Sequence, residues 1–190
     1  MNRMKSQQQG FTLIELIVVI VILGILASVA VPKFVGVQTD ARVAKLNATR
    51  GAMLAAASMV HSAYLVRGGT ADTAPCPGGG GTATNLVSGT ICTEGGIVNL
   101  FDGYPASTAL GTPGIISAAG LSSTTFAPTL AQLNVEGLGA TANAVVTTIS
   151  VIGGPGTNAL KTNPTCSFTY TRAAAVGAMP VFSAVTTTGC

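Results

Sequence analysis

Hydrophobic and polar positions divide the start of the chain into two distinct parts. Residues 1–10, MNRMKSQQQG, are polar, and residues 11–31 form an apolar run of 21 residues that a single carboxylate, Glu15, interrupts. As a helix this run is about 31 Å long, at about 1.5 Å per residue. That length matches the hydrocarbon core of a bilayer, which is about 30 Å thick. The pattern therefore predicts a helix able to cross a membrane.

After Pro32 the helical pattern continues but becomes amphipathic. Small and apolar residues recur at spacings of three and four, which places them on one face of a helix. This stripe is mostly alanine and permits close approach to a sheet or to another helix. It comprises Val37, Ala41, Ala44, Ala48, Ala52, Ala55, Met59, Ala63 and Val66. Gly68 and Gly69 are a stop signal, so we expect one helix over residues 11–67, about 86 Å long.

The remaining chain reads as loops and short strands. Residues 68–96 are rich in glycine and predict a loop, and residues 96–105 predict a strand followed by a turn. Residues 117–125 predict a helical turn, and residues 145–152, VVTTISVI, predict a strand. Residues 166–190 contain two alternating runs around AVGAMP, which is typical of a hairpin. Three to five antiparallel strands against the helix's second half give an α+β fold.

Composition favours a secreted or surface protein over a cytosolic enzyme. Of the 190 residues, 48% are hydrophobic and only 8% are charged, far below the usual quarter. The net charge of +3 is mild and lacks the clustered basic face of nucleic-acid-binding proteins, so we expect no nucleic-acid partner.

All four cysteines, Cys76, Cys92, Cys166 and Cys190, follow the helix. An even number after an apolar amino terminus indicates disulfides in an oxidising compartment. Four cysteines permit three pairings, and we expect the sequential one, Cys76–Cys92 and Cys166–Cys190, in which each bridge closes a short loop. Lys and Arg number two before the apolar run and four soon after it, a distribution that favours the opposite orientation. Disulfides need an oxidising compartment, and we give this more weight than the distribution of Lys and Arg. We therefore expect the carboxyl-terminal part to lie outside the cytoplasm.

The apolar run permits two interpretations. It resembles a secretory signal with a small-residue cleavage site after Ala30, which would release a soluble protein. Alternatively, a short leader is cut off after Gly10 and the helix is retained. Glu15 favours the second interpretation, because a carboxylate in an apolar membrane segment is costly and usually has a partner. Cleavage after Gly10 creates an α-amine on Phe11, largely protonated at neutral pH, which can pair with Glu15 of its own chain or of a neighbour.

These features resemble the amino terminus of type IV pilins and pseudopilins. The matching residues are Gly10, then Phe11 to Glu15 (FTLIE), then an apolar helix that contains Gly24 and Pro32. The resemblance implies cleavage by a prepilin peptidase between Gly10 and Phe11, methylation of the new amine, and its pairing with Glu15 of an adjacent subunit. It also implies that the segment between Gly24 and Pro32 loosens when subunits pack.

The resemblance further implies a helical homopolymer. Residues 1–10 would be the leader, 11–35 the membrane and filament-core helix, and 36–190 a globular head with a disulfide-bonded β-region. The partners would be the inner membrane of a Gram-negative bacterium before assembly and the type IV pilus assembly machinery, with an extracellular filament as the product. The sequences FDGYP and CSFTYT…PVF…TTTGC resemble pilins of the mannose-sensitive haemagglutinin group, which implies adhesion and biofilm formation.

A pseudopilin of type II secretion, which forms a short periplasmic piston, is the main alternative. By resemblance to the major pseudopilin, Glu94 and Asp102 are candidate calcium ligands together with backbone carbonyls. The single histidine, His61, we expect to be a solvated or interfacial residue. The chain offers no set of catalytic residues, so we expect no enzyme activity, no cofactor and no metal.

Overall fold

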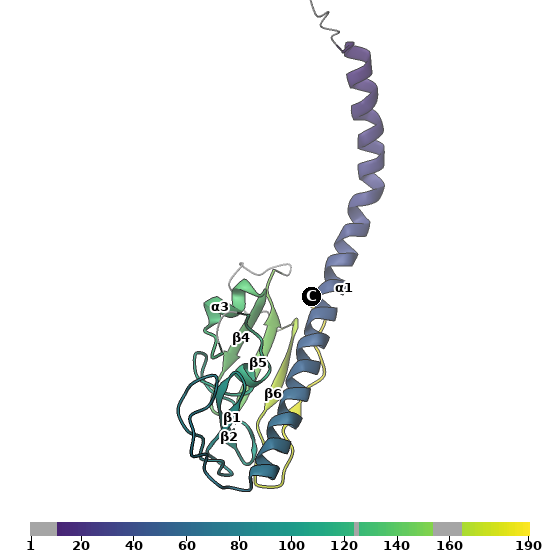
Figure 1. Cartoon of the computed structure of the whole chain (residues 1–190). Coiled ribbons are helices and arrows are strands. Elements are labelled where there is room, and N and C mark those ends of the chain that lie inside the picture. The colour runs from purple at the N-terminus through teal and green to yellow at the C-terminus, as the bar shows by residue number, and fades with distance from the viewer. Residues whose placement is uncertain (1–10, 124–125, 154–164) are drawn as a thin grey trace, which may run out of the picture. The chain divides into compact units, whose positions relative to one another are not determined.

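The computed structural model describes residues 11–123, 126–153 and 165–190. The chain divides into two compact units, Met1–Thr39 and Asp40–Cys190. A single helix, α1 (Leu13–Arg67), supplies all the regular structure of the first unit within those residues and continues into the second (Figure 1).

The helix α1 begins and ends close to the positions that the sequence predicts. Neither Gly24 nor Pro32 ends it. At its carboxyl end the Gly68 amide donates to the carbonyl of Tyr64 at 3.0 Å. Gly68 and Gly69 both have positive φ, 59° and 75°, the left-handed conformation with which glycine commonly closes a helix.

The second unit contains two antiparallel sheets and two short helices, in agreement with the predicted α+β class. One sheet has the order β1-β2-β3 and the other has the order β4-β5-β6-β7. Their strands are β1 (Thr90–Thr93), β2 (Gly96–Phe101), β3 (Tyr104–Pro105), β4 (Leu138–Ala142), β5 (Val146–Val151), β6 (Ser167–Thr171) and β7 (Val181–Phe182). The short helices are α2 (Ile115–Ala118) and α3 (Leu130–Val135).

Several sequence-based expectations need correction. Seven strands are described where three to five were expected. The predicted loop 68–96 contains β1, because Ile91 pairs with Val98 and both side chains are fully buried. The predicted helical turn at 117–125 overlaps α2, which starts earlier, at Ile115, and ends at Ala118. Residues 124–125 lie outside the described residues. Helix α3 and strand β4 were not predicted at all.

The head buries a different face of α1 from the alanine stripe. The buried positions are Leu46, Met53, Ala57 and Val60, which pack among Ile149, Phe168 and Tyr170 of the second sheet and Ile91 and Val98 of the first. Apart from the half-buried Ala63, the stripe is exposed. Both faces have helical periodicity, but the larger side chains bury more apolar area, at about 25 cal/mol per Å².

Tyr170 connects the two sheets. Its side chain is fully buried on β6, and its hydroxyl donates to the carbonyl of Pro105 on β3 at 2.5 Å. Burial, with a smaller contribution from Tyr104, raises the pKa of Tyr170, because an ionised phenolate is poorly solvated there. A second polar pair between these regions joins Ser107 and Thr147, 2.7 Å apart.

Replacing Tyr170 by Phe tests this connection. We expect Tyr170→Phe to lower the free energy of unfolding at pH 7 by about 1 kcal/mol, the usual contribution of one hydrogen bond. Because the folded pKa is raised, the stabilisation is complete below the unfolded pKa, about 10, and is lost as the pH rises from there towards the folded value. Denaturation followed by circular dichroism at pH 7 and above pH 10 measures both effects.

Tyr64→Phe, a half-buried tyrosine on α1, is the matched control and should change little. Equal alkaline loss of stability in wild type and Tyr170→Phe would contradict the assignment.

Candidate functional site

From Leu13 to Val31, α1 presents exposed apolar side chains on every face. An 18-residue window in this helix has a mean hydropathy of 3.0, and none of it is buried. Phe11 is 94% exposed, and each large apolar side chain from Leu13 to Val31 is exposed. A helix that is apolar all round is stable only inside a membrane or among other apolar helices.

Glu15 has a partner that our sequence analysis did not predict. Its carboxylate accepts a hydrogen bond from the Thr12 backbone N–H at 2.9 Å and from the Thr12 hydroxyl at 2.7 Å. In return, the Glu15 N–H donates to the Thr12 hydroxyl at 3.3 Å. This reciprocal arrangement is a capping box. Its signal, T-x-x-E before an apolar run, was present in the sequence.

The capping box changes the interpretation of the carboxylate. Within the single chain one carboxylate oxygen of Glu15, Oε2, already accepts two hydrogen bonds, which lowers the cost of an apolar setting. Gly10, where we expect cleavage, lies outside the described residues, and the pairing of Glu15 with the Phe11 amine of a neighbour stays a prediction.

Gly24 and Pro32 both lie within α1. A Cβ atom added to Gly24 would meet no atom of the described chain within 4 Å, so close packing inside one molecule does not require glycine there. The side chains of residues 32–35 lie outside what the structure describes. A loosening of the helix between these two residues stays a prediction.

Three cations on the second half of α1 dock the head through backbone carbonyls. Arg42 donates to the carbonyls of Cys190 and Gly153, at 2.6 and 2.5 Å. Lys45 donates to the carbonyl of Glu136, and Arg50 donates to that of Ser183 at 2.9 Å. Hydrogen bonds from charged donors are stronger than neutral ones. These residues explain why cations follow the apolar run.

Two disulfides, Cys76–Cys92 and Cys166–Cys190, each join one cysteine to the next cysteine along the chain. They close loops of 16 and 24 residues, and the chain-entropy model gives each about 3 kcal/mol. Cys166 and Cys190 belong to the main apolar core.

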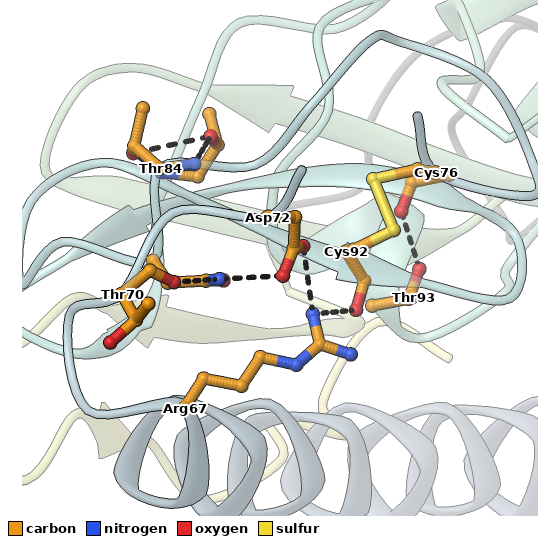
Figure 2. A network of polar contacts seen from close by, with 10 residues as sticks. Arg67, Thr70, Asp72, Cys76, Thr84, Cys92 and Thr93 are labelled. Carbon is orange, nitrogen blue, oxygen red and sulfur yellow. Dashed lines mark hydrogen bonds and ion pairs between the residues drawn. A yellow bond between two sulfur atoms is a disulfide. The ribbon is translucent and has the colours of Figure 1, made fainter. Parts of the chain in front are cut away.

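A polar network connects the end of α1 to the first disulfide (Figure 2). Arg67 donates to the carboxylate of Asp72 at 3.4 Å and to the carbonyl of Cys92 at 3.0 Å. The amide of Asn85, which is fully buried, donates to the other oxygen of Asp72 at 2.9 Å. Asp72 also lies near the sulfurs of Cys76 and Cys92. Those sulfurs are bridged and Asp72 is neutralised by Arg67, so the group holds the loop together and is unsuited to a metal.

The calcium site considered from the sequence is wrong. Glu94 lies in the turn before β2 and Asp102 in the turn after it. Six residues of strand separate them by about 20 Å, at about 3.3 Å per residue, so they cannot share an ion. His61 stacks on Tyr104, with ring centroids 4.0 Å apart, and its Nδ1 lies 2.9 Å from the carbonyl of Gly103. It is a contact between α1 and the β2–β3 turn.

Comparisons with known proteins found one family model and several relatives that match part of the chain. The family model described as the prokaryotic N-terminal methylation motif matches residues 5–31. The type IV narrow pilus major component PilA5 of Thermus thermophilus is 48% identical over 58 residues, which are 30% of this chain and 44% of that protein. A type IV major fimbrial protein FimA of Dichelobacter nodosus is 44% identical over 50 residues, 26% of this chain and 32% of that protein.

The chain therefore matches less than half of the length of these relatives. No solved structure matches it.

Removal of the Thr12 hydroxyl tests the capping box. We expect Thr12→Ala to weaken the first turn by about 1 kcal/mol, the usual cost of losing a helix cap, so that the hydrogen-bonded amides of Glu15 and Leu16 exchange about fivefold faster. Thr12→Ser keeps the hydroxyl and should exchange like wild type. Hydrogen exchange by NMR on the full chain in detergent micelles measures this, and equal rates in all three proteins would contradict the cap.

Proposed function

We propose that the chain is a member of the type IV pilin family and a structural subunit of a type IV pilus, on the evidence of its methylation motif and its apolar amino-terminal helix. Members of this family are structural proteins, and we propose a structural role and no enzyme activity for this chain. The observation that carries the proposal is an apolar helix that is uncovered from Leu13 to Val31, carries one carboxylate in its first turn and lies within the matched motif. Such a helix needs a bilayer first and a bundle of like helices afterwards.

We assign three parts to the chain in this cycle. A prepilin peptidase removes residues 1–10 by cleavage between Gly10 and Phe11, and the new amine is methylated. Residues 11–35 hold the subunit in the inner membrane and later form the core of the filament. Residues 36–190 form the head, which stays outside the cytoplasm and lies on the filament surface.

Assembly exchanges one apolar environment for another. The assembly machinery extracts the helix from lipid, and identical helices then cover its side chains, so little apolar area meets water. In that setting Glu15 pairs with the Phe11 amine of an adjacent subunit. A wrong axial register leaves an unpaired charge, which costs several kcal/mol in an apolar environment. Because Thr12 already holds the carboxylate, it keeps Glu15 hydrogen-bonded until the neighbour arrives.

The head suggests a more specific kind of pilus. The resemblance to mannose-sensitive haemagglutinin pilins includes FDGYP, which forms the β2–β3 turn and β3, and the segment from Cys166 to Cys190, which contains β6, β7 and one disulfide. We propose attachment and biofilm formation as the role of filaments built from this chain. The pseudopilin alternative is weakened, because its expected calcium ligands lie at opposite ends of β2.

The first residue of the mature protein shows whether the apolar helix is retained or removed. Mass spectrometry of the protein from its own bacterium should find an N-methylated Phe11 as the first residue. An amino terminus at Val31 would instead show a secreted protein and overturn the proposal.

Loss of the carboxylate tests its role in assembly. We expect Glu15→Ala to insert into the membrane at the wild-type level but to lower the filament yield at least tenfold. The variant loses the pair with the neighbour's amine, and each loss of about 1.4 kcal/mol corresponds to a factor of ten. Immunoblots of sheared filaments and of membrane fractions measure the two quantities. Thr12→Ser is the control for a tolerated change in the same turn, and a normal filament yield from Glu15→Ala would refute the role.

A further inference from the structure

An apolar pocket lies in the head between the last turns of α1, the β1–β2 turn and α2. Its volume is about 630 Å³, which is within the range of small-molecule sites. Most of its wall is apolar, and the side chains that form it include Ala56, Met59, Val60, Ala118 and Phe126. Met59 is 71% exposed, so the pocket opens to solvent beside this residue. A ligand with an apolar body can enter there and exclude water from these side chains.

The charged groups around the pocket leave a net negative charge. Two ionised side chains, Arg67 and Glu94, belong to its wall. Arg67 forms an ion pair with Asp72 at 3.4 Å and also donates to the carbonyl of Cys92 (Figure 2). This is the one ion pair among the residues that the structure describes, so the exposed carboxylate of Glu94 is left without a cation. A cationic group is therefore attracted to this pocket, and an anionic group is repelled.

The aromatic ring of Phe126 lies against the turn that carries Glu94. A Cβ atom added to Gly95, the residue after Glu94, would lie 2.6 Å from Cδ2 of Phe126, and one added to Gly96 would lie 2.9 Å from its Cδ1. The two glycines therefore let the ring pack directly on the backbone of this turn. The face of an aromatic ring attracts cations, and organic ammonium ions are commonly bound in this way. The turn thus brings a carboxylate and an aromatic ring into the wall of one pocket.

Other classes of ligand fit these groups less well. The single carboxylate of Glu94 supplies too few oxygen atoms for Ca²⁺, which takes about six to eight oxygen ligands. A phosphate or carboxylate ligand would meet the net negative charge. A lipid headgroup that carries a phosphate beside its ammonium group would meet the same repulsion. These comparisons favour a free ammonium ion.

We propose that the pocket binds a free organic ammonium ion that has an apolar body. The ammonium group lies beside the carboxylate of Glu94 and the ring of Phe126, and the hydrocarbon part covers Met59 and Ala118. Charge complementarity selects the cation, and the apolar wall selects a ligand with a hydrocarbon part over a small hydrated ion. This binding activity goes beyond the proposed function and does not depend on assembly, since every residue involved belongs to the head of one chain.

Methyl NMR on the full chain tests this site. The chain carries ¹³C at its methionine methyl groups, is kept in micelles of an uncharged detergent, and is titrated with benzyltrimethylammonium. We expect the methyl resonance of Met59 to shift until it saturates, with a Kd of about 1 mM, in keeping with a ligand of this size. Met179 is 75% exposed and does not belong to the pocket wall. Its resonance is the internal control and should not move.

Matched ligands and variants separate the charge from the apolar contact. The uncharged benzyl alcohol and the anion benzenesulfonate should each bind at least about fivefold more weakly, and Glu94→Gln should weaken binding of the cation by a similar factor. Asp40→Asn removes the same charge from an exposed residue of α1 outside the pocket and should bind like wild type. The resonance of the fully buried Met53 verifies that the variants are folded.

Three results would overturn the inference: a Met59 resonance that does not shift, equal binding of benzyl alcohol, or wild-type binding by Glu94→Gln. Tighter binding of glycerophosphocholine than of benzyltrimethylammonium would also overturn it, because a lipid headgroup would then be the ligand. None of these results bears on the proposed pilus subunit, since no filament enters the assay.

Discussion

An apolar helix that its own chain leaves uncovered is the constraint on which the rest of this protein depends. The exposed side chains between Leu13 and Val31 make the isolated chain unsuited to water, so a bilayer or other copies of the helix must cover them. The leader and the retained helix that we propose, together with the disulfide-bonded head, meet this requirement, because they describe a subunit that is held in lipid and is later transferred to a bundle.

Few residues of this chain are charged, and several of the cations on α1 bind backbone carbonyls of the head. Only 8% of residues are charged. Arg42, Lys45 and Arg50 on α1 donate to backbone carbonyls of the head, so these hydrogen bonds fix separate segments of the head to the helix. Arg67 repeats the device at the end of α1, where it joins Asp72 to the carbonyl of Cys92.

Glu15 shows how a costly group can be tolerated in stages. In the single chain Thr12 supplies two hydrogen bonds to the carboxylate, which lowers the cost of placing it near the membrane boundary. Those bonds are local and require no second molecule, whereas the pairing that we propose with the methylated amine of a neighbour requires the filament. The similarity to PilA5 and FimA is limited to less than half of those proteins.

The sequence by itself determined the helix, the α+β class and the likeness to pilins, because hydrophobic periodicity and a short motif are local properties that need no distant contacts. It also contained the capping box of Thr12 and Glu15, which we did not recognise. Only the tertiary structure decided which face of α1 is buried. The alanine stripe and the row through Leu46, Met53 and Val60 share one period, and long-range packing against the sheets selects the larger side chains. Strand β1 likewise depends on its pairing with β2, since four residues beside a glycine-rich loop carry too weak a local preference to form a strand alone.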